Sequence, residues 1–426
     1  MRVLFMNRPD WEQNPGDDTV VIKEYMRILA GMGIETVFNC DPDTAMDRFD
    51  IIHIINLTMT GSTEKLAQSA SRQQKPFVVT TLQEDFPKFR SKVHFAANRL
   101  TAYVKSGQNP ETLKHFSEAI HQVPQSTNLT SPFAALSANR LLACGEHEAA
   151  ILHRMFPRSS VSVVKFGTSK QTQNYVNKEL FTSAYNVKDF VLCVGRIEPR
   201  KNQLMLLTAL EHDNIPIVFV DGATTFSPSY KNACMKFKRS GKTIFTGTLS
   251  NELLLSAYIS AKVHCLPGFY ELPGLASLDA ARYGCKVTAS SWGTLPDYLG
   301  NTIRYFEPDN CNNLRASLFD TIESVPHPDL MPLAASFTWE KSAADILSIY
   351  KEILDVPYVP HSPVSDYDLV FDPLSFVEII LKNVDCGNYT DAISIYKTFR
   401  SGYVTDSHLA QLDLLIEKFE SMADIL

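Results

Sequence analysis

Two cations follow an apolar, strand-like run in the second half of this 426-residue chain. The run ends at Gly195, and Arg196 and Lys201 come before the next helical pattern begins. An arginine fork can hold a phosphate through two parallel hydrogen bonds, whereas a lysine supplies a compact and mobile point charge. The segment therefore suits a diphosphate that departs with negative charge. A solvated basic turn is the other interpretation of the same residues.

Two acids stand at a similar strand-to-helix connection further along the chain. Glu271 falls in the loop 267–274, and Asp279 falls within the helical pattern that follows. Each carboxylate can accept hydrogen bonds from a pair of sugar hydroxyls, such as those of a hexose or a ribose. The other interpretation makes Glu271 a helix-start acid and Asp279 a solvated residue, although Asp279 stands among apolar neighbours where an unpaired charge is costly.

Backbone groups at the start of that helix complete the predicted anion site. Gly274 lets the first amides of the helix approach a phosphate closely, and the positive end of the helix dipole adds to the attraction. A third strand-to-helix turn, 245–252, contains Gly247 and a helix cap at Ser250 or Asn251. Its loop could line a nucleotide-base pocket, and by itself it is also an ordinary turn.

The elements that must position these residues alternate between short apolar strands and helical patterns. In the first half we expect strands at 2–6, 34–38, 50–55, 76–80, 141–144 and 161–165, a helix that ends before Gly33, and a helix at 146–155. After a polar linker at 167–177 the pattern restarts. In the second half we expect strands at 190–194, 216–220, 243–245, 262–266, 286–289 and 302–306, and helices at 202–210, 251–259 and 275–283.

This alternation predicts an α/β protein with two doubly wound, Rossmann-like parallel sheets in tandem. Ligands of such sheets bind beyond the carboxyl ends of the strands, so we expect the site in a cleft between two facing units. The predicted domains are 1–167, on the acceptor side, and 168–339, on the nucleotide-sugar side. A helix at 340–354 crosses back, and a small helical appendage at 355–426 follows several prolines, with dimerisation or partner docking as its expected role.

Composition narrows the class of function. The formal charge of -7 comes from 47 acidic and 40 basic residues without a long basic run, which argues against nucleic acid as a partner. The apolar runs are far shorter than the roughly 20 residues that span a bilayer, and the start of the chain is typical of a first strand and not of a signal peptide. We therefore expect a cytoplasmic protein. Eight cysteines without CxxC pairs or a histidine cluster predict reduced thiols, with neither a zinc site nor a disulfide framework.

The order and spacing of these motifs resemble glycosyltransferase family 4, whose members have the GT-B architecture. The resemblance runs over residues 190–354 and includes the segments VGRIEPRKN, FTGTLS, YELPGLASLDAARYGCKV and FTWEKSA. In the family's acidic motif, two glutamates separated by seven residues, Glu271 fills the first place and would hold the hexose, and Asp279 fills the second and would hold the ribose. The donor-binding residues that the resemblance implies are Gly16, Gly195, Arg196, Lys201, Gly247, Glu271, Gly274, Leu275 and Asp279, of which Arg196, Lys201 and Glu271 would also be catalytic.

The first half resembles the family less closely. Such families have a glycine-rich turn after the first strand that approaches the donor phosphate and the acceptor, and here the segment 14–19 retains Gly16 where two glycines are common. Relatives often place a histidine after the strand that ends at Thr81. This chain has Gln83, Glu84 and Asp85 in that region. Any of the three could take a polar role, and no catalytic base is nominated.

The resemblance implies retaining transfer of a hexose from a nucleotide diphosphate sugar to a hydroxyl of a glycolipid, polysaccharide or other glycan. A lipid acceptor would bring peripheral contact with a membrane. Arginine and lysine would take the place of a divalent ion, so neither a metal nor a cofactor is expected. Two alternatives stay open. One is a phosphorylase-like enzyme, which would need a pyridoxal lysine site that we do not find, and the other is a non-catalytic nucleotide-sugar-binding or scaffold protein of the same fold.

Overall fold

A computed structural model describes residues 1–126, 128, 130–168, 177–222 and 227–357. Nearly all of the predicted appendage at 355–426, with its expected role in forming a homo-oligomer, lies outside the described residues, and so does most of the predicted linker. The described parts of both sheets belong to one compact unit. No helix within the described ranges combines the length and the apolar character needed to cross a membrane.

The first sheet holds six parallel strands in the order β2-β1-β3-β4-β5-β6. Val3 and Phe5 of β1 enter one core cluster, whereas Leu4 and Met6 enter another, because successive side chains of a strand point to opposite faces. Burial on both faces is typical of a parallel sheet, since its crossover helices cover each side. The strands are β1 (Arg2–Met6), β2 (Glu35–Asn39), β3 (Ile51–Ile55), β4 (Phe77–Thr80), β5 (Arg140–Ala143) and β6 (Val161–Val163).

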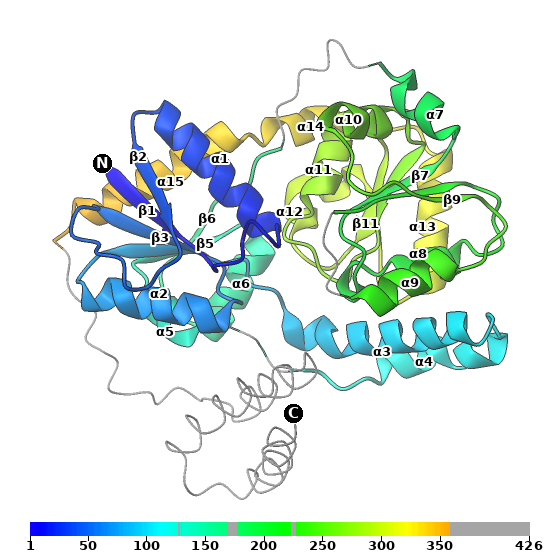
Figure 1. Cartoon of the computed structure of the whole chain (residues 1–426), viewed down its shortest axis with the longest axis horizontal. Coiled ribbons are helices and arrows are strands. Elements are labelled where there is room, and N and C mark those ends of the chain that lie inside the picture. The colour runs from blue at the N-terminus through cyan, green and yellow to red at the C-terminus, as the bar shows by residue number, and fades with distance from the viewer. Residues whose placement is uncertain (127, 129, 169–176, 223–226, 358–426) are drawn as a thin grey trace, which may run out of the picture. The chain divides into compact units, whose positions relative to one another are not determined.

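Helices cover both faces of this sheet. α1 (Asp17–Gly31) packs against α15 (Trp339–Leu354), and α2 (Thr60–Arg72) packs against α5 (Pro132–Ser137). Figure 1 shows these two pairs on opposite sides of the strands. α6 (Glu146–Met155) connects β5 to β6. We refer to this sheet and the helices that cover it as the first domain.

The second sheet repeats the design with the order β12-β11-β10-β7-β8-β9, again all parallel. Its strands are β7 (Val191–Val194), β8 (Ile217–Val220), β9 (Thr243–Phe245), β10 (Val263–Leu266), β11 (Val287–Ser290) and β12 (Arg304–Phe306). Its helices are α7 (Glu179–Tyr185), α8 (Gln203–Ala209), α9 (Pro228–Lys236), α10 (Asn251–Ser260), α11 (Leu275–Arg282), α12 (Leu295–Leu299), α13 (Cys311–Glu323) and α14 (Leu330–Ser336), with short 3-10 turns η3 (Pro199–Lys201) and η4 (Gly300–Thr302). We refer to this part as the second domain.

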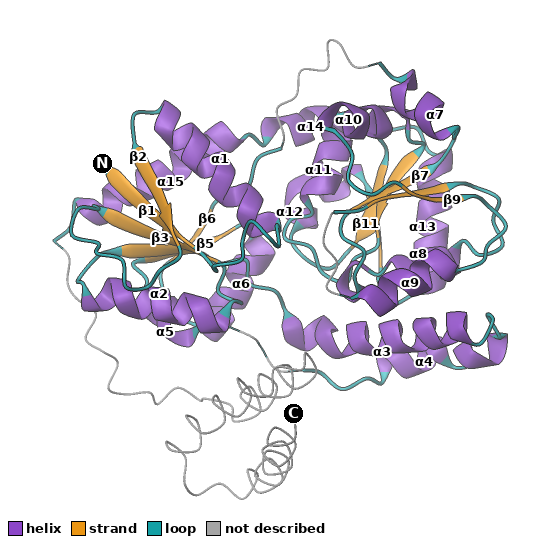
Figure 2. Cartoon of the chain, viewed as in Figure 1, coloured by secondary structure: helices purple, strands orange, loops and turns teal. Residues whose placement is uncertain are grey.

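The helices of the second domain also form two layers. α8 packs against α9 and α13, while α10 packs against α7 and α11 packs against α14. Figure 2 shows the strands of each sheet between helices. The predicted fold class, two Rossmann-like α/β units of the GT-B kind, is therefore confirmed for the described residues. The helix predicted at 202–210 begins one residue later, because Asn202 has a left-handed backbone with φ 59°.

A long helix of the first half packs on the second domain. α3 (Phe86–Lys105), followed by η1 (Pro110–Leu113) and α4 (Phe116–His121), contacts α8, α9 and η3. The Phe89 ring stacks on Tyr270 with centroids 5.2 Å apart, and Lys92 pairs with buried Asp309 at 2.6 Å. Tyr103 donates to the carboxylate of Glu211 at 2.9 Å. These contacts fix the loop that precedes α3 against the second domain.

α15 returns to the first domain and closes a buried polar network there. Tyr350 and Thr80 contact the two ring nitrogens of His53 at 2.5 and 2.7 Å, and the hydroxyl of Tyr25 meets that of Ser342 at 2.9 Å. All of these groups are nearly inaccessible to solvent. Because buried polar groups are costly when unpaired, this network specifies how α15 docks on β3 and α1.

Candidate functional site

The loop between β7 and α8 carries the predicted cations, and its conformation is fixed by hydrogen bonds to three neighbouring connections. Asp221 accepts from the amide of Ile197 at 3.0 Å, and the side chain of Gln203 donates to the carbonyl of Arg196 at 2.8 Å. Asn202, which is 1% exposed, donates to the carbonyls of Pro267 and Pro308 at 3.1 and 2.8 Å. The left-handed backbone of Asn202 suits asparagine, and its amide ties the ends of three strands together.

The central feature of the site is an ion pair between Lys201 and Glu271. The lysine Nζ lies 2.7 Å from Glu271 Oε2, and the two side chains are 12% and 2% exposed. The other oxygen, Oε1, is buried and has no hydrogen-bond partner among the residues that the structure describes. A buried carboxylate oxygen without a donor is costly unless a ligand supplies one. The pair therefore combines a cation with an acceptor that suits a hydroxyl group.

Two glycines allow Glu271 to take this position. A Cβ at Gly268 would lie 2.1 Å from Glu271 Oε1, and a Cβ at Gly293 would lie 2.2 Å from the carbonyl oxygen of Glu271. Glu271 forms an isolated parallel bridge with Gly293, and its carbonyl accepts from the amide of Thr294 at 3.0 Å. The carboxylate is thus set by close backbone packing, which only residues without side chains permit at these two positions.

Arg196, the second predicted cation, extends to the first domain. Its Nη1 donates to the carbonyl of Pro15 at 3.0 Å, and its Nη2 lies 3.4 Å from Glu198 Oε1. Gly16, at the start of α1, is close by, since a Cβ there would lie 3.6 Å from Arg196 Nη1. The structure therefore brings the predicted glycine of the first half next to a predicted cation of the second.

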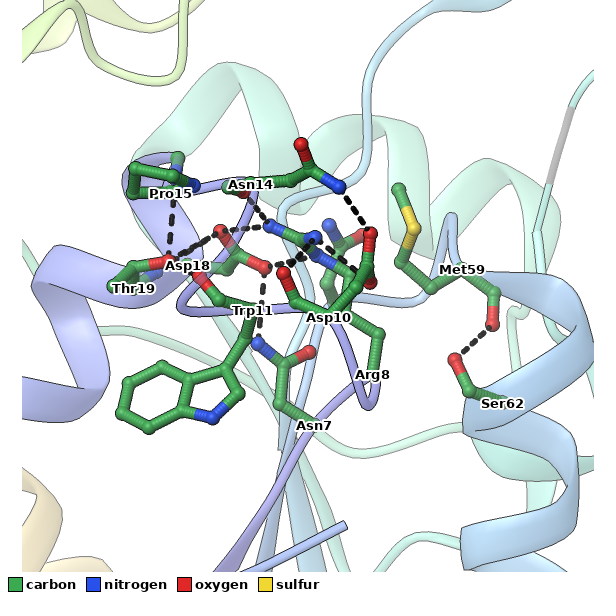
Figure 3. A network of polar contacts seen from close by, with 12 residues as sticks. Asn7, Arg8, Asp10, Trp11, Asn14, Pro15, Asp18, Thr19, Met59 and Ser62 are labelled. Carbon is green, nitrogen blue, oxygen red and sulfur yellow. Dashed lines mark hydrogen bonds and ion pairs between the residues drawn. The ribbon is translucent and has the colours of Figure 1, made fainter. Parts of the chain in front are cut away.

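The β1–α1 loop that supplies Pro15 is organised by Arg8, as Figure 3 shows. Its guanidinium bonds to Asp18 through Nε at 2.8 Å, to the Asp10 carboxylate at 2.9 Å, and to the carbonyl of Asn14. Although burial acts to lower the pKa of Arg8, hydrogen bonds and charge from Asp18 and Asp10 raise it above the ordinary value. Asn7, 1% exposed, also donates to Asp18. The carboxylates of Asp18 and Asp10 converge on one cation, and these charged hydrogen bonds hold the loop in its conformation.

The other predicted residues have the following positions. Gly274 is the residue before α11 and has φ 83°, and no side chain of the described residues caps the helix that starts at Leu275. Asp279 lies on α11. Burial of Tyr258 raises the pKa of that tyrosine, and the charge of Asp279 raises it further. Gly195 and Gly247 have φ 148° and 68°, and within the described part of the chain no atom of another segment lies within 4 Å of a Cβ built at either glycine. The predicted cap of α10 is confirmed as Ser250, which accepts from the amide of Leu253.

Sequence reasoning overlooked the role of Arg200 and left that of Glu84 open. Arg200 Nη1 donates to Glu84 Oε1 at 2.7 Å and to the carbonyl of Tyr270 at 3.0 Å. Burial acts to lower the pKa of Arg200, but the charges of Glu84, Glu271 and Glu198 raise it. The signal for Arg200 was its place between two site residues in a short cationic run. Its partner lies in another domain, so no spacing in the sequence could reveal it.

The structure thus places Arg196 against the β1–α1 loop, and it joins the loops after β7 and β10 through the Lys201–Glu271 pair. Each cation can offset negative charge, and Glu271 Oε1 can accept a hydrogen bond from a hydroxyl group. Among the described residues, no group of three or more histidines, cysteines, aspartates and glutamates is placed to hold a metal ion.

Known proteins resemble the second domain in sequence. A family model described as "Glycosyl transferases group 1" matches residues 179–324, which include β7, β10 and α11. O-antigen chain mannosyltransferase B of Escherichia coli is 23% identical over 173 residues, which are 38% of this chain and 45% of that protein. A sulfoquinovosyl transferase of Arabidopsis thaliana is 33% identical over 146 residues, 31% of this chain and 27% of the other. The chain thus spans less than half the length of these curated relatives.

Solved structures match over a larger part of the chain. The match to the sucrose-phosphate synthase of Thermosynechococcus elongatus covers 83% of this chain and 100% of that one. Its TM-score is 0.60 and the sequence identity is 14%. Anabaena HepE in complex with UDP-glucose gives the same coverage, TM-score and identity. These likenesses establish the GT-B fold, and the sequence matches establish similarity to glycosyltransferases over the second domain.

Proposed function

We propose that the protein is a retaining glycosyltransferase that moves a hexose from a nucleotide diphosphate sugar to an acceptor hydroxyl without a metal. The observation that carries the proposal is the Lys201–Glu271 pair, in which one carboxylate oxygen is bound at 2.7 Å and the other is buried without a donor among the residues that the structure describes. That free oxygen suits a sugar hydroxyl, and the lysine suits the phosphate attached to the same sugar.

The chain's own residues would stabilise the leaving diphosphate. Arg196 and Lys201 supply positive charge, and the uncapped start of α11 at Gly274 and Leu275 supplies amides and the helix dipole. Because these groups are already positioned, they cost little reorganisation when negative charge develops. The acceptor would attack from the face of the departing group, which takes up the acceptor's proton. In this scheme Glu271 orients the hexose and Asp279 binds the ribose.

The acceptor we propose is a hydroxyl of a glycan or glycolipid, bound from the side of the first domain. The relatives named above are an O-antigen chain mannosyltransferase and a sulfoquinovosyl transferase. HepE binds UDP-glucose in its solved complex. UDP-, GDP- and ADP-linked hexoses are therefore the donors to try first.

The first experiment is a thermal-shift screen of the full chain with UDP, GDP and ADP and their hexose conjugates. A ligand that binds only the native state raises the melting temperature by mass action, so one base should give a clear rise. Hydrolysis and transfer of the matching sugar are then measured. Absence of a shift with every nucleotide would contradict the proposal.

The alternative is a non-catalytic nucleotide-sugar-binding or scaffold protein. It is favoured by the β1–α1 loop, in which Asp17 and Asp18 follow Gly16 where relatives commonly have a second glycine. The same experiment separates the two functions. A binding protein should show the thermal shift yet release no sugar from the donor, with or without a mixture of acceptor glycans.

A further inference from the structure

Arg200 stands at the crossing of three chain segments around the Lys201–Glu271 pair. Its Nη1 donates to Glu84 Oε1 at 2.7 Å and to the Tyr270 carbonyl at 3.0 Å, and its Nη2 lies 3.7 Å from Glu198 Oε1. Its own carbonyl accepts from the amide of Phe269 at 2.8 Å. One residue therefore bonds to the loop after β4, the loop after β7 and the loop after β10.

Arg200 and Tyr270 each stand next to one member of the Lys201–Glu271 pair in the sequence. Arg200 precedes Lys201, and Tyr270 precedes Glu271. A bond between the guanidinium and the Tyr270 carbonyl consequently fixes the distance between the backbones that carry the lysine and the acid. A planar guanidinium offers several donors in a fixed geometry, so it can serve Glu84 and the carbonyl together. A lysine at this position would offer a point charge without that geometry.

Glu84, the partner of Arg200 in the first domain, lies in a loop that buried hydrogen bonds hold in place. Glu148, which is fully buried, accepts from the amides of Gln83 and Cys144 at 2.6 Å each and from the hydroxyl of Thr81. This network fixes the loop that carries Glu84. α3 begins two residues after Glu84 and packs on the second domain. The Glu84–Arg200 bond thus joins two rigid segments and is not a contact between mobile side chains.

Charge balance explains why Arg200 would not bind the donor phosphate itself. It faces Glu84 and Glu198, with side chains 14% and 11% exposed, whereas Lys201 forms an ion pair with Glu271 alone among the described residues. A phosphate would have to displace two acids from Arg200. Lys201, with one acidic partner, is a cation that a phosphate can reach at lower cost.

We propose that Arg200 is a positioning residue of the donor site and that Glu84 anchors it to the first domain, so that the Lys201–Glu271 geometry depends on contact between the two domains. This proposal rests on the proposed function, because it assigns Arg200 a role in a donor site. It predicts that the loss of Arg200 geometry lowers the rate of the chemical step more than it weakens donor binding, since a displacement of about 1 Å in a site can cost about a hundredfold in rate.

The test compares Arg200→Lys, Glu84→Gln and the double variant in the full chain, with kcat and donor KM measured beside the melting temperature. We expect Arg200→Lys to lower kcat about 10- to 100-fold while KM changes less than about threefold. Glu84→Gln should lower kcat in the same direction. The double variant should lose little more than Arg200→Lys alone, because both changes remove one interaction.

The matched control is Arg315→Lys. Arg315 also bonds to a carboxylate, Asp213 at 2.6 Å, but it lies on α13 and is 50% exposed. We expect its kcat to match that of the wild type. The proposal is overturned if Arg200→Lys keeps wild-type kcat, if the two single losses multiply in the double variant, or if the losses simply follow the melting temperature.

The wild-type protein decides the proposed function separately. If it binds nucleotides without turnover, the proposed transfer reaction fails, and the positioning role, which predicts a loss of rate, fails with it. If the wild type binds no nucleotide, the proposed function fails and the role of Arg200 in a donor site fails with it. If the wild type turns over the donor, and Arg200→Lys and Glu84→Gln keep the wild-type kcat as Arg315→Lys does, the proposed function stands and only the role of Arg200 is wrong.

Discussion

Arg196 of the second domain donates a hydrogen bond of 3.0 Å to the carbonyl oxygen of Pro15 in the first domain. The contact joins the predicted phosphate-binding cation to the turn that contains Gly16. Because a main-chain oxygen accepts this bond, the position of Arg196 depends on the backbone of the β1–α1 loop and not on a particular side chain there. A change that loosens this loop should therefore reach the donor site.

The buried Lys201–Glu271 pair leads to a prediction that separates stability from activity. Lys201→Met should lower the free energy of unfolding by about 3–5 kcal/mol, because it leaves the carboxylate of Glu271 uncompensated in a site that excludes water. Glu271→Gln alone should be less disruptive, since the amide keeps the shape. Both should reduce the transfer rate about a hundredfold or more, the scale for losing a preorganised charge contact. Chemical denaturation and donor turnover measure the two effects.

The double variant Lys201→Met with Glu271→Gln is the control for this prediction. It removes both charges, so its unfolding free energy should recover most of the loss seen with Lys201→Met. Its activity should not recover. Recovery of turnover in the double variant would show that neither side chain takes part in the reaction.

Gly268 should be intolerant of a methyl group. A Cβ there would lie 2.1 Å from Glu271 Oε1, so Gly268→Ala must displace the carboxylate. We expect kcat/KM for the donor to fall about a hundredfold, as a small displacement in a site can do. Steady-state kinetics with the full chain provide the measurement.

Gly61→Ala is the matched glycine control. Gly61 lies in α2, and a Cβ there would meet no atom of another described segment within 4 Å. Alanine is the better helix residue, so this change should raise the unfolding free energy by about 0.5–1 kcal/mol and leave the kinetics unchanged. Equal kinetic losses in both variants would mean that the packing at Gly268 has no special role.

The Arg8–Asp18 pair should stabilise the β1–α1 loop and, through it, Arg196. The side chains are 12% and 5% exposed. Asp18→Asn should cost about 3 kcal/mol of unfolding free energy, since it leaves Arg8 without its main buried partner. It should also raise the donor KM, because the Pro15 carbonyl would no longer be held toward Arg196. Denaturation and initial rates at varied donor concentration test both effects.

An exposed pair on the same helix provides the comparison. Arg27 and Glu24 are 59% and 30% exposed. Exposed pairs contribute at most about 1 kcal/mol, so Arg27→Ala should change stability little and the donor KM not at all. The role assigned to the loop is wrong if Asp18→Asn is as mild as Arg27→Ala.

His53 should make the protein less stable in acid. Burial lowers the pKa of His53 to about 3 from an ordinary value of 6.5. Between these values the unfolded chain binds a proton that the folded protein does not, so stability falls as the pH drops below 6.5. The loss approaches about 1.4 kcal/mol per pH unit for one such group, or about 2 kcal/mol between pH 7.5 and 5.

Comparing the wild type with His53→Gln isolates the contribution of His53 to the pH dependence of stability. Other groups titrate too: burial raises the pKa of Glu64 to about 7, which acts in the opposite direction because it destabilises the protein as the pH rises. The difference between the two proteins cancels such contributions. Urea denaturation from pH 7.5 to 5 should show a shallower decline for His53→Gln, and parallel curves would contradict the assignment.

Local pattern was sufficient for the fold and for placing Lys201 and Glu271 after strands of one sheet. The alternation of apolar runs and helical periods predicts both parallel sheets, because burial on two faces requires such sequences whatever the neighbours are. The strand-to-loop positions of Lys201 and Glu271 also followed from the sequence, since carboxyl ends of parallel strands meet at one edge. That is why two residues separated by 70 positions form an ion pair.

Other features depended on the tertiary structure. Arg200 and Glu84 are separated by 116 positions and lie in different domains. No periodic pattern in the sequence predicts that α3 of the first half packs on the second domain, or that Arg196 bonds to Pro15. Residue spacing reports which side chains share a face of one element, whereas contacts between loops depend on how the two sheets are brought together. The sequence therefore determined the two sheets and the charges at their edges, and tertiary packing decided which of those charges meet.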